Sequence, residues 1–82
     1  MHELGLLWRV RKQDDAMEAR LAWEDVRGHV VVLYCNGCIV SSEAFEDSAM
    51  RALEVADQHR RNLLGCGWTQ QLRERLIDSY AA

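Results

Sequence analysis

The dipeptide Asn36-Gly37, set between two runs of β-forming residues, constrains this chain more than any other feature of its sequence. The runs Val30 to Cys35 and Cys38 to Val40 are rich in β-branched and aromatic residues, which favour strands. A two-residue type I′ turn needs positive φ at both central positions, and asparagine followed by glycine tolerates this best. The sequence therefore predicts a β-hairpin over residues 29–45.

The turn also predicts the register of this hairpin, because the pairing of successive residues follows from the two-residue loop. The expected pairs are Cys35 with Cys38, Tyr34 with Ile39, Leu33 with Val40, and Val32 with Ser41. Val31, Leu33 and Val40 should then share one face. Both faces are apolar near the turn, which predicts a central, well-covered pair of strands.

Two further strands are predicted before the hairpin. Apolar and polar residues alternate from Leu6 to Val10 and from Ala19 to Trp23, and polar turn residues follow each run. A helix is the alternative for residues 3–12, since Leu4, Leu7 and Trp8 also fit helical spacing, but the alternation favours a strand. On this pattern Trp8 and Trp23 face the core.

The period of the apolar residues changes to that of a helix after Asp47. Asp47 or Ser48 can accept hydrogen bonds from the free amides of the first turn, and Gly65 is placed to end the helix in the left-handed conformation. A second, short helix is predicted after Trp68, with Thr69 as its cap. Its apolar stripe consists of Leu72, Leu76, Ile77 and Tyr80.

The predicted fold is therefore α+β: an antiparallel sheet of three to four strands (a β-meander) followed by two helices packed on one face. With 82 residues, the chain should form a single domain over residues 1–82. Domains of this size bury only about 60% of the surface of the unfolded chain, so a second subunit would add stability, and a homodimer stays among the alternatives.

Charge and cysteine content narrow the class of protein. A net charge of −3 gives no overall attraction to nucleic acid or to an anionic membrane, and no apolar run is long enough to span a bilayer. Three cysteines without a secretory signal indicate reduced thiols. We therefore expect a soluble, cytoplasmic protein that makes no membrane contact.

The Cys35-x-x-Cys38 pair has the spacing of a zinc knuckle but supplies only two of four ligands. Cys66, His29 and His59 are the other candidates, and His29 lies about 20 Å from Cys35 along the same strand. A redox role is disfavoured, because the pair flanks a turn and lacks the helix dipole that lowers a thiol pKa. The preferred interpretation is two structural thiols, with zinc and redox chemistry as alternatives, so no metal or cofactor site is predicted.

No constellation of catalytic residues is present, since the serines lack a nucleophile elbow, the carboxylates fall at turns and the glycines are scattered. A non-enzymatic protein is therefore expected. Arg60 and Arg61 are the strongest local basic feature, but interleaved acids such as Asp57 favour a solvated helix face over a phosphate track.

Several short motifs occur together along the chain: a strand led by Trp8, a strand ending in Gly28, the Asn36-Gly37 hairpin, and an arginine-rich helix closing at Gly67-Trp68. This pattern resembles short uncharacterised bacterial proteins, and such small acidic domains are reminiscent of phage or mobile-element proteins that inhibit host defence. The resemblance implies a shared small sheet-and-helix fold.

The function expected from the sequence is that of a small protein-binding module, an inhibitor or adaptor of the phage anti-defence type, acting by occupying a macromolecular surface. A nucleic-acid-binding or zinc-stabilised regulatory element is the alternative. A protein partner is thus preferred to nucleic acid. The candidate interaction residues are Trp68, Leu72, Leu76, Tyr80, Arg60 and Arg61.

Overall fold

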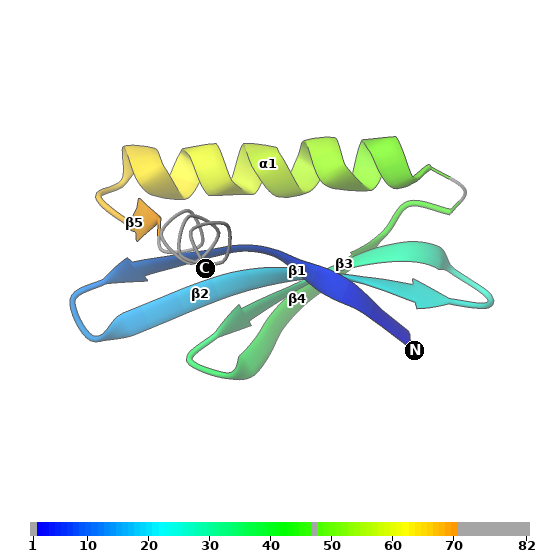
Figure 1. Ribbon diagram of the computed structural model, residues 1–82, viewed down its shortest axis with the longest axis horizontal. Helices are drawn as coiled ribbons and strands as arrows, with labels where there is room; N and C mark the ends of the chain where they lie inside the picture. The colour runs from blue at the N-terminus through cyan, green and yellow to red at the C-terminus, as the bar shows by residue number, and fades with distance from the viewer. Residues whose placement is uncertain (1, 47, 71–82) are drawn as a thin grey trace, which may run out of the picture.

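The structure is a computed structural model that describes residues 2–46 and 48–70. In chain order these residues form β1 (His2–Lys12), β2 (Asp15–Glu24), β3 (Gly28–Cys35), β4 (Cys38–Ala44), α1 (Ala49–Gly65) and β5 (Thr69–Gln70). The strands make one antiparallel sheet in the order β4-β3-β2-β1-β5, and α1 lies along one face of it (Figure 1). The predicted α+β class is confirmed, with a wider sheet and a single helix in the described part.

Residues 3–12 form a strand, so the helical alternative for this segment is wrong. β1 pairs with β2 along its whole length, with register shifts between Glu3 and Gly5 and between Leu6 and Trp8. Beyond the second shift Trp8 and Val10 are buried on the side of α1. Leu7 also packs against this core, because the irregularity breaks the strict alternation that the sequence suggests.

The hairpin turn is confirmed, with positive φ at Asn36 (52°) and Gly37 (87°). Cys35 faces Cys38 and Tyr34 faces Ile39, as predicted. Further from the turn the predicted register is wrong by one residue.

Leu33 faces Ser41 and Val32 faces Ser42, because β4 has a bulge between its Ile39 and Ser41 pairs. Val40 is the extra residue in this bulge, so it does not share a paired face with Leu33. The predicted central position of the hairpin is also wrong, since β4 lies at the end of the sheet.

The main core lies between the sheet and α1. It is built from Trp8, Val10, Ala19, Val31, Ala52 and Ala56, all almost fully buried. Because α1 contributes alanines at its centre, its backbone lies close to the sheet, and the Trp8 indole Nε1–H donates to the Ala56 carbonyl oxygen at 2.8 Å. Trp23 is half-buried outside this cluster, and its ring meets His29 edge-on at a centroid distance of 4.9 Å.

α1 begins at a serine cap, as predicted: the Ser48 hydroxyl oxygen accepts from the Arg51 amide at 3.1 Å. Its end differs from the prediction. Gly65 is still helical, and Gly67 adopts the left-handed conformation, with φ of 95°. The Trp68 amide donates to Leu63 and the Gly67 amide to Leu64, which is the hydrogen-bond pattern of a Schellman motif. This pattern needs the left-handed residue one position after the cap Cys66, and that position is Gly67.

Thr69 does not cap a second helix, because it belongs to β5, where it pairs with Arg11 and its hydroxyl donates to the Arg11 carbonyl oxygen at 3.1 Å. The rest of the predicted second helix lies outside the described residues. Among those that are described, no helix has the length and apolar character needed to cross a membrane.

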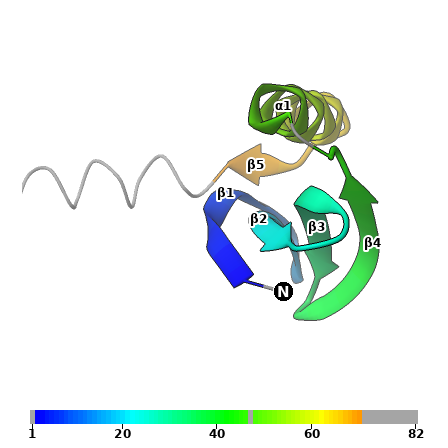
Figure 2. The same cartoon turned by 90° about the vertical axis from the view of Figure 1, so that its right-hand side faces the viewer.

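The sheet is strongly curved, with β1 and β4 on either side of β2 and β3 (Figure 2). This curvature explains the burial of Ala22, Val30 and Val32, whose paired positions lie on the face opposite the α1 core. Neighbouring side chains of a curved sheet close over such residues without a covering helix. A polar cluster lies on the same face.

Candidate functional site

The outer edge of β4 (the β4 edge) is the most exposed part of the sheet. Among the strands that the structure describes, β4 pairs only with β3, and all seven residues of β4 are exposed. Two of them are large and apolar: Ile39 is 60% exposed and Val40 is 55% exposed. Every second N–H and C=O along such an edge points away from the sheet, and no strand of the described residues pairs with them. The β4 edge is therefore an available template for another extended chain.

The tip of the β3–β4 hairpin is held by Asn36. Its side-chain oxygen accepts from the Ala16 amide at 2.9 Å, and its side-chain nitrogen donates to Asp15 Oδ1 at 3.1 Å. The Asn36 backbone amide also donates to the Ala16 carbonyl oxygen at 2.8 Å. These three bonds join the hairpin tip to the start of β2, so the beginning of β4 has a defined position.

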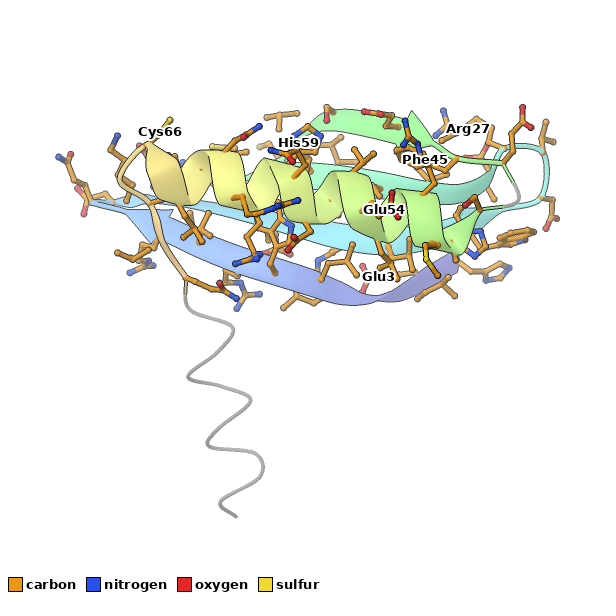
Figure 3. The ribbon with its side chains drawn as sticks, turned by 90° about the horizontal axis from the view of Figure 1, so that it is seen from above. Glu3, Arg27, Phe45, Glu54, His59 and Cys66 are labelled. Atoms are coloured by element: carbon orange, nitrogen blue, oxygen red, sulfur yellow. The ribbon has the colours of Figure 1, made fainter. Side chains whose placement is uncertain are left out.

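The other end of β4 is held by the segment that leads to α1. The Phe45 amide donates to the His29 carbonyl oxygen at 2.8 Å, and the His29 amide donates to the Glu46 carbonyl oxygen at 3.1 Å. The Phe45 side chain packs against the core (labelled in Figure 3). Gly28 allows this contact, since any Cβ there would overlap the Glu46 backbone. With both ends held, the β4 edge is preorganised for contact.

The chemistry of the β4 edge is mainly neutral. Glu43 is the single charged residue of β4, and the strand has neither the lysine nor the proline with which sheet edges commonly resist pairing. Ile39 and Ser42 lie on the face opposite α1, since they pair with Tyr34 and Val32. Glu43 pairs with Val31 and so lies toward the side of α1.

The face opposite α1 carries a charged cluster centred on Arg20. Its guanidinium bonds to Glu18 and, at 2.7 Å, to Glu3, while Arg9 bonds to Glu18 at 3.3 Å. The hydrogen bond that Arg20 donates to Glu18 is the largest influence on the pKa of Arg20 and raises it above its ordinary value. Burial opposes this rise, while the charge of Glu18, the hydrogen bond to Glu3 and the charge of Glu3 add to it. Tyr34 lies under this guanidinium at 6.0 Å.

A shallow cavity of about 220 Å³ lies beside this cluster, lined in part by Glu3, Arg20 and Tyr34. The two arginines and two glutamates neutralise one another, so the cavity presents no net charge to an ionic ligand. We therefore interpret the cluster as structural ion pairs of this face and not as a binding site for an ionic ligand.

The structure places half of the interaction residues predicted from the sequence. Trp68 is half-buried and packs against the core. Arg60 and Arg61 both bond to Asp57, at 2.7 Å and 3.1 Å, so a single carboxylate neutralises much of this basic feature. The other three residues, Leu72, Leu76 and Tyr80, lie outside the described residues, and their role stays a prediction.

The cysteines also take defined positions. Cys35 and Cys38 face each other across the turn as free thiols, and Cys66 is exposed at the end of α1, far along the chain. In residues 2–46 and 48–70, no three histidine, cysteine, aspartate or glutamate side chains gather in the manner of a metal site.

Sequence reasoning missed the β4 edge because the apolar residues beside the turn suggested a covered strand. A signal was present further along, where Ser41, Ser42 and Glu43 are polar in succession and so offer no apolar face to bury.

Comparisons of this chain with protein-family models, with curated proteins and with solved structures find no match.

Proposed function

We propose that this chain is a non-enzymatic protein-binding module, an inhibitor or adaptor, that takes an extended segment of a partner protein onto the β4 edge. The observation that carries the proposal is the exposure of all seven residues of β4, including Ile39 and Val40, on a strand held at both ends. Strand addition gains affinity from main-chain hydrogen bonds and specificity from alternate side chains.

The β4 edge also indicates the chemistry of the partner. Ile39 and Val40 favour a segment with apolar residues near the hairpin tip, since apolar cross-strand pairs stabilise a sheet. Glu43 favours a lysine or arginine in the segment, because opposite charges on neighbouring strands attract. We therefore propose an extended, uncharged to mildly basic peptide segment as the occupant.

Nucleic-acid binding has less support. The two arginines that suggested it share bonds with Asp57, and Glu54 and Glu43 add negative charge to the exposed surface. A phosphate backbone would be repelled by those acids and would have to compete with Asp57 for both guanidiniums.

The experiment compares two matched variants in affinity capture from the source cell. Val40→Lys places one charge on the β4 edge, whereas Val26→Lys places one in the β2–β3 turn, where Val26 is 92% exposed. We expect the edge variant to weaken capture of the partner by about tenfold or more, and the turn variant to leave it unchanged. The urea midpoint of each variant shows that it is folded.

Full retention of the partner by the folded edge variant would contradict the proposal. So would an equal loss from both variants, because that result would reflect charge and not the position of the substitution. Capture of this chain by itself, with a dimer in sedimentation that the edge variant abolishes, would identify the partner strand as a second copy.

A further inference from the structure

Three sulfur-containing side chains come from directly paired positions on three neighbouring strands. Met17 of β2 pairs with Cys35 of β3, and Cys35 pairs with Cys38 of β4. Residues that face each other across antiparallel strands point to the same side of the sheet. Met17, Cys35 and Cys38 (the sulfur row) therefore lie in line on one face, and the bulge in the β3–β4 pairing, which lies beyond Tyr34, does not interrupt this row.

The sulfur row lies on the face that α1 covers. Met17 also pairs with Val10, which is fully buried in the core beneath the helix, and Met17 itself packs against that core. Cys35 is half-buried, and Cys38 is exposed. The row is therefore backed by the core at Met17 and open to solvent at Cys38, which gives a small ion a way in.

Backbone hydrogen bonds hold the sulfur row in position. Asn36, which directly follows Cys35, accepts from the Ala16 amide at 2.9 Å through its side-chain oxygen and donates its own amide to the Ala16 carbonyl oxygen at 2.8 Å. Ala16 directly precedes Met17. The turns that follow β1 and β3 lie at the same end of the sheet, and these bonds join them there (Figure 1). Ligands carried by strands that are fixed to one another keep a more precise geometry than ligands on loops.

The spacing of the two cysteines suits a bound ion better than a disulfide. Residues paired across antiparallel strands have Cβ atoms about 4.5–5.5 Å apart, and a pair that flanks a two-residue turn lies toward the wide end of this range. A disulfide prefers Cβ atoms about 3.8 Å apart. Two thiolates that each lie about 2.3 Å from one metal ion, as in zinc sites, are separated by up to about 4.6 Å. An ion therefore fits between the Cys35 and Cys38 thiols, which are free in this structure.

The ligand atoms of the sulfur row select a soft ion. Cysteine thiolates and methionine thioethers favour Cu(I). Zinc takes four ligands from cysteine, histidine and carboxylates, and within residues 2–46 and 48–70 no histidine, aspartate or glutamate joins the two cysteines in a group of three. The Met17 side chain is unbranched and adaptable, so its thioether can lean over Cys35 as a third sulfur ligand.

We propose that the sulfur row binds one Cu(I) ion, with the thiolates of Cys35 and Cys38 and the thioether of Met17 as its ligands. Both thiols release their protons to solvent as the ion binds. Two thiolates and one Cu(I) leave a single negative charge, which solvent stabilises at the exposed Cys38. The bound ion links β2, β3 and β4 at one end of the sheet, and it adds stability because it binds the folded chain in preference to the unfolded one.

Titration of the full chain with Cu(I) under argon, against bicinchoninate as a competing chelator, tests this proposal. We expect one Cu(I) per chain. Cys35→Ser and Cys38→Ser should each weaken binding by about a hundredfold or more, and Met17→Leu, which keeps the apolar volume, by about tenfold. The matched control is Cys66→Ser, which removes an exposed thiol at the end of α1 and should leave the affinity for Cu(I) unchanged (Figure 3).

X-ray absorption at the copper edge gives a second measurement that needs no variant. We expect three sulfur neighbours of copper in the unmodified chain, and two in Met17→Leu. Fewer than three in the unmodified chain would overturn the proposal.

Binding too weak to compete with bicinchoninate would also overturn the proposal, as would an affinity that Cys38→Ser or Met17→Leu leaves unchanged. An equal loss in Cys66→Ser would place the ion elsewhere. One ion for two chains, with a dimer in sedimentation, would assign the ion to exposed thiols of two copies and so contradict the proposed site. The urea midpoint of each metal-free variant shows that it is folded.

Discussion

Trp8 joins the two layers of the molecule through one polar atom. Its indole fills the core, and its Nε1–H bonds to the Ala56 carbonyl oxygen of α1. We expect Trp8→Phe to lower the free energy of unfolding by about 1–3 kcal/mol, because a buried acceptor loses a partner and the smaller ring leaves space. Urea denaturation measures this loss. Trp23→Phe is the control. An equal loss of free energy of unfolding in this variant would show that the hydrogen bond from Trp8 to Ala56 does not account for the effect.

Gly28 is required by the path of the backbone. Its φ of 78° lies in the left-handed region, and a Cβ would overlap the Glu46 backbone. We expect Gly28→Ala to lower the free energy of unfolding by about 2–4 kcal/mol, since both the strain and the overlap must be relieved. Gly5→Ala is the matched control, because a Cβ at Gly5 has open space around it. If the two variants have the same thermal or urea midpoint, this account of the contact between Gly28 and the Glu46 backbone is wrong.

At the scale of elements, the two glycines at the end of α1 have opposite roles. Gly67 is the left-handed residue of the Schellman motif, whereas Gly65 is an ordinary helical position. We expect Gly67→Ala to destabilise the protein by about 1 kcal/mol and Gly65→Ala to stabilise it by up to about 1 kcal/mol. Denaturation midpoints that move in opposite directions confirm the assignment. The reverse order would support the sequence-based expectation that Gly65 ends the helix.

The elements themselves follow largely from local sequence. Asn36 and Gly37 determine their turn through their own φ preferences, and Ser48 caps α1 through its own hydroxyl, so both were predictable. The bulge at Val40 was not, because it depends on how β4 follows the twist of β3 and leaves no mark in the alternation of residues. Thr69 was misassigned for a related reason: a threonine before a helical pattern is a typical cap, and only its contact with Arg11 makes it a strand.

The candidate site was the least predictable part. Exposure of the β4 edge depends on the order of strands in the sheet, which no single strand encodes. The apolar residues Ile39 and Val40 look like core residues when read alone, and only the polar run from Ser41 to Glu43 argues against it. Sequence reasoning selected Trp68 for its type, whereas in the structure this side chain packs against the core.

At the scale of the whole molecule, protection should differ across the sheet. β2 and β3 each have a strand on both sides, while β4 is exposed throughout and has one neighbour within residues 2–46 and 48–70. We expect amides of β4 to exchange faster than those of β2 and β3, since an edge strand opens without breaking the core. Hydrogen exchange of the isolated chain measures this order. Equal protection of β4 and β2 would mean that another chain already covers the β4 edge.

The pairing of β5 with β1 also bears on the order in which the molecule forms. β1 to β4 are joined by short turns, so they can pair as soon as each has been synthesised, whereas Thr69 bonds to Arg11 across 58 residues. This pair forms only after residue 69 has been synthesised, later than the pairs within β1 to β4. During synthesis the outer side of β1 therefore stays open until β5 reaches it, and β5 then pairs with Val10 and Arg11.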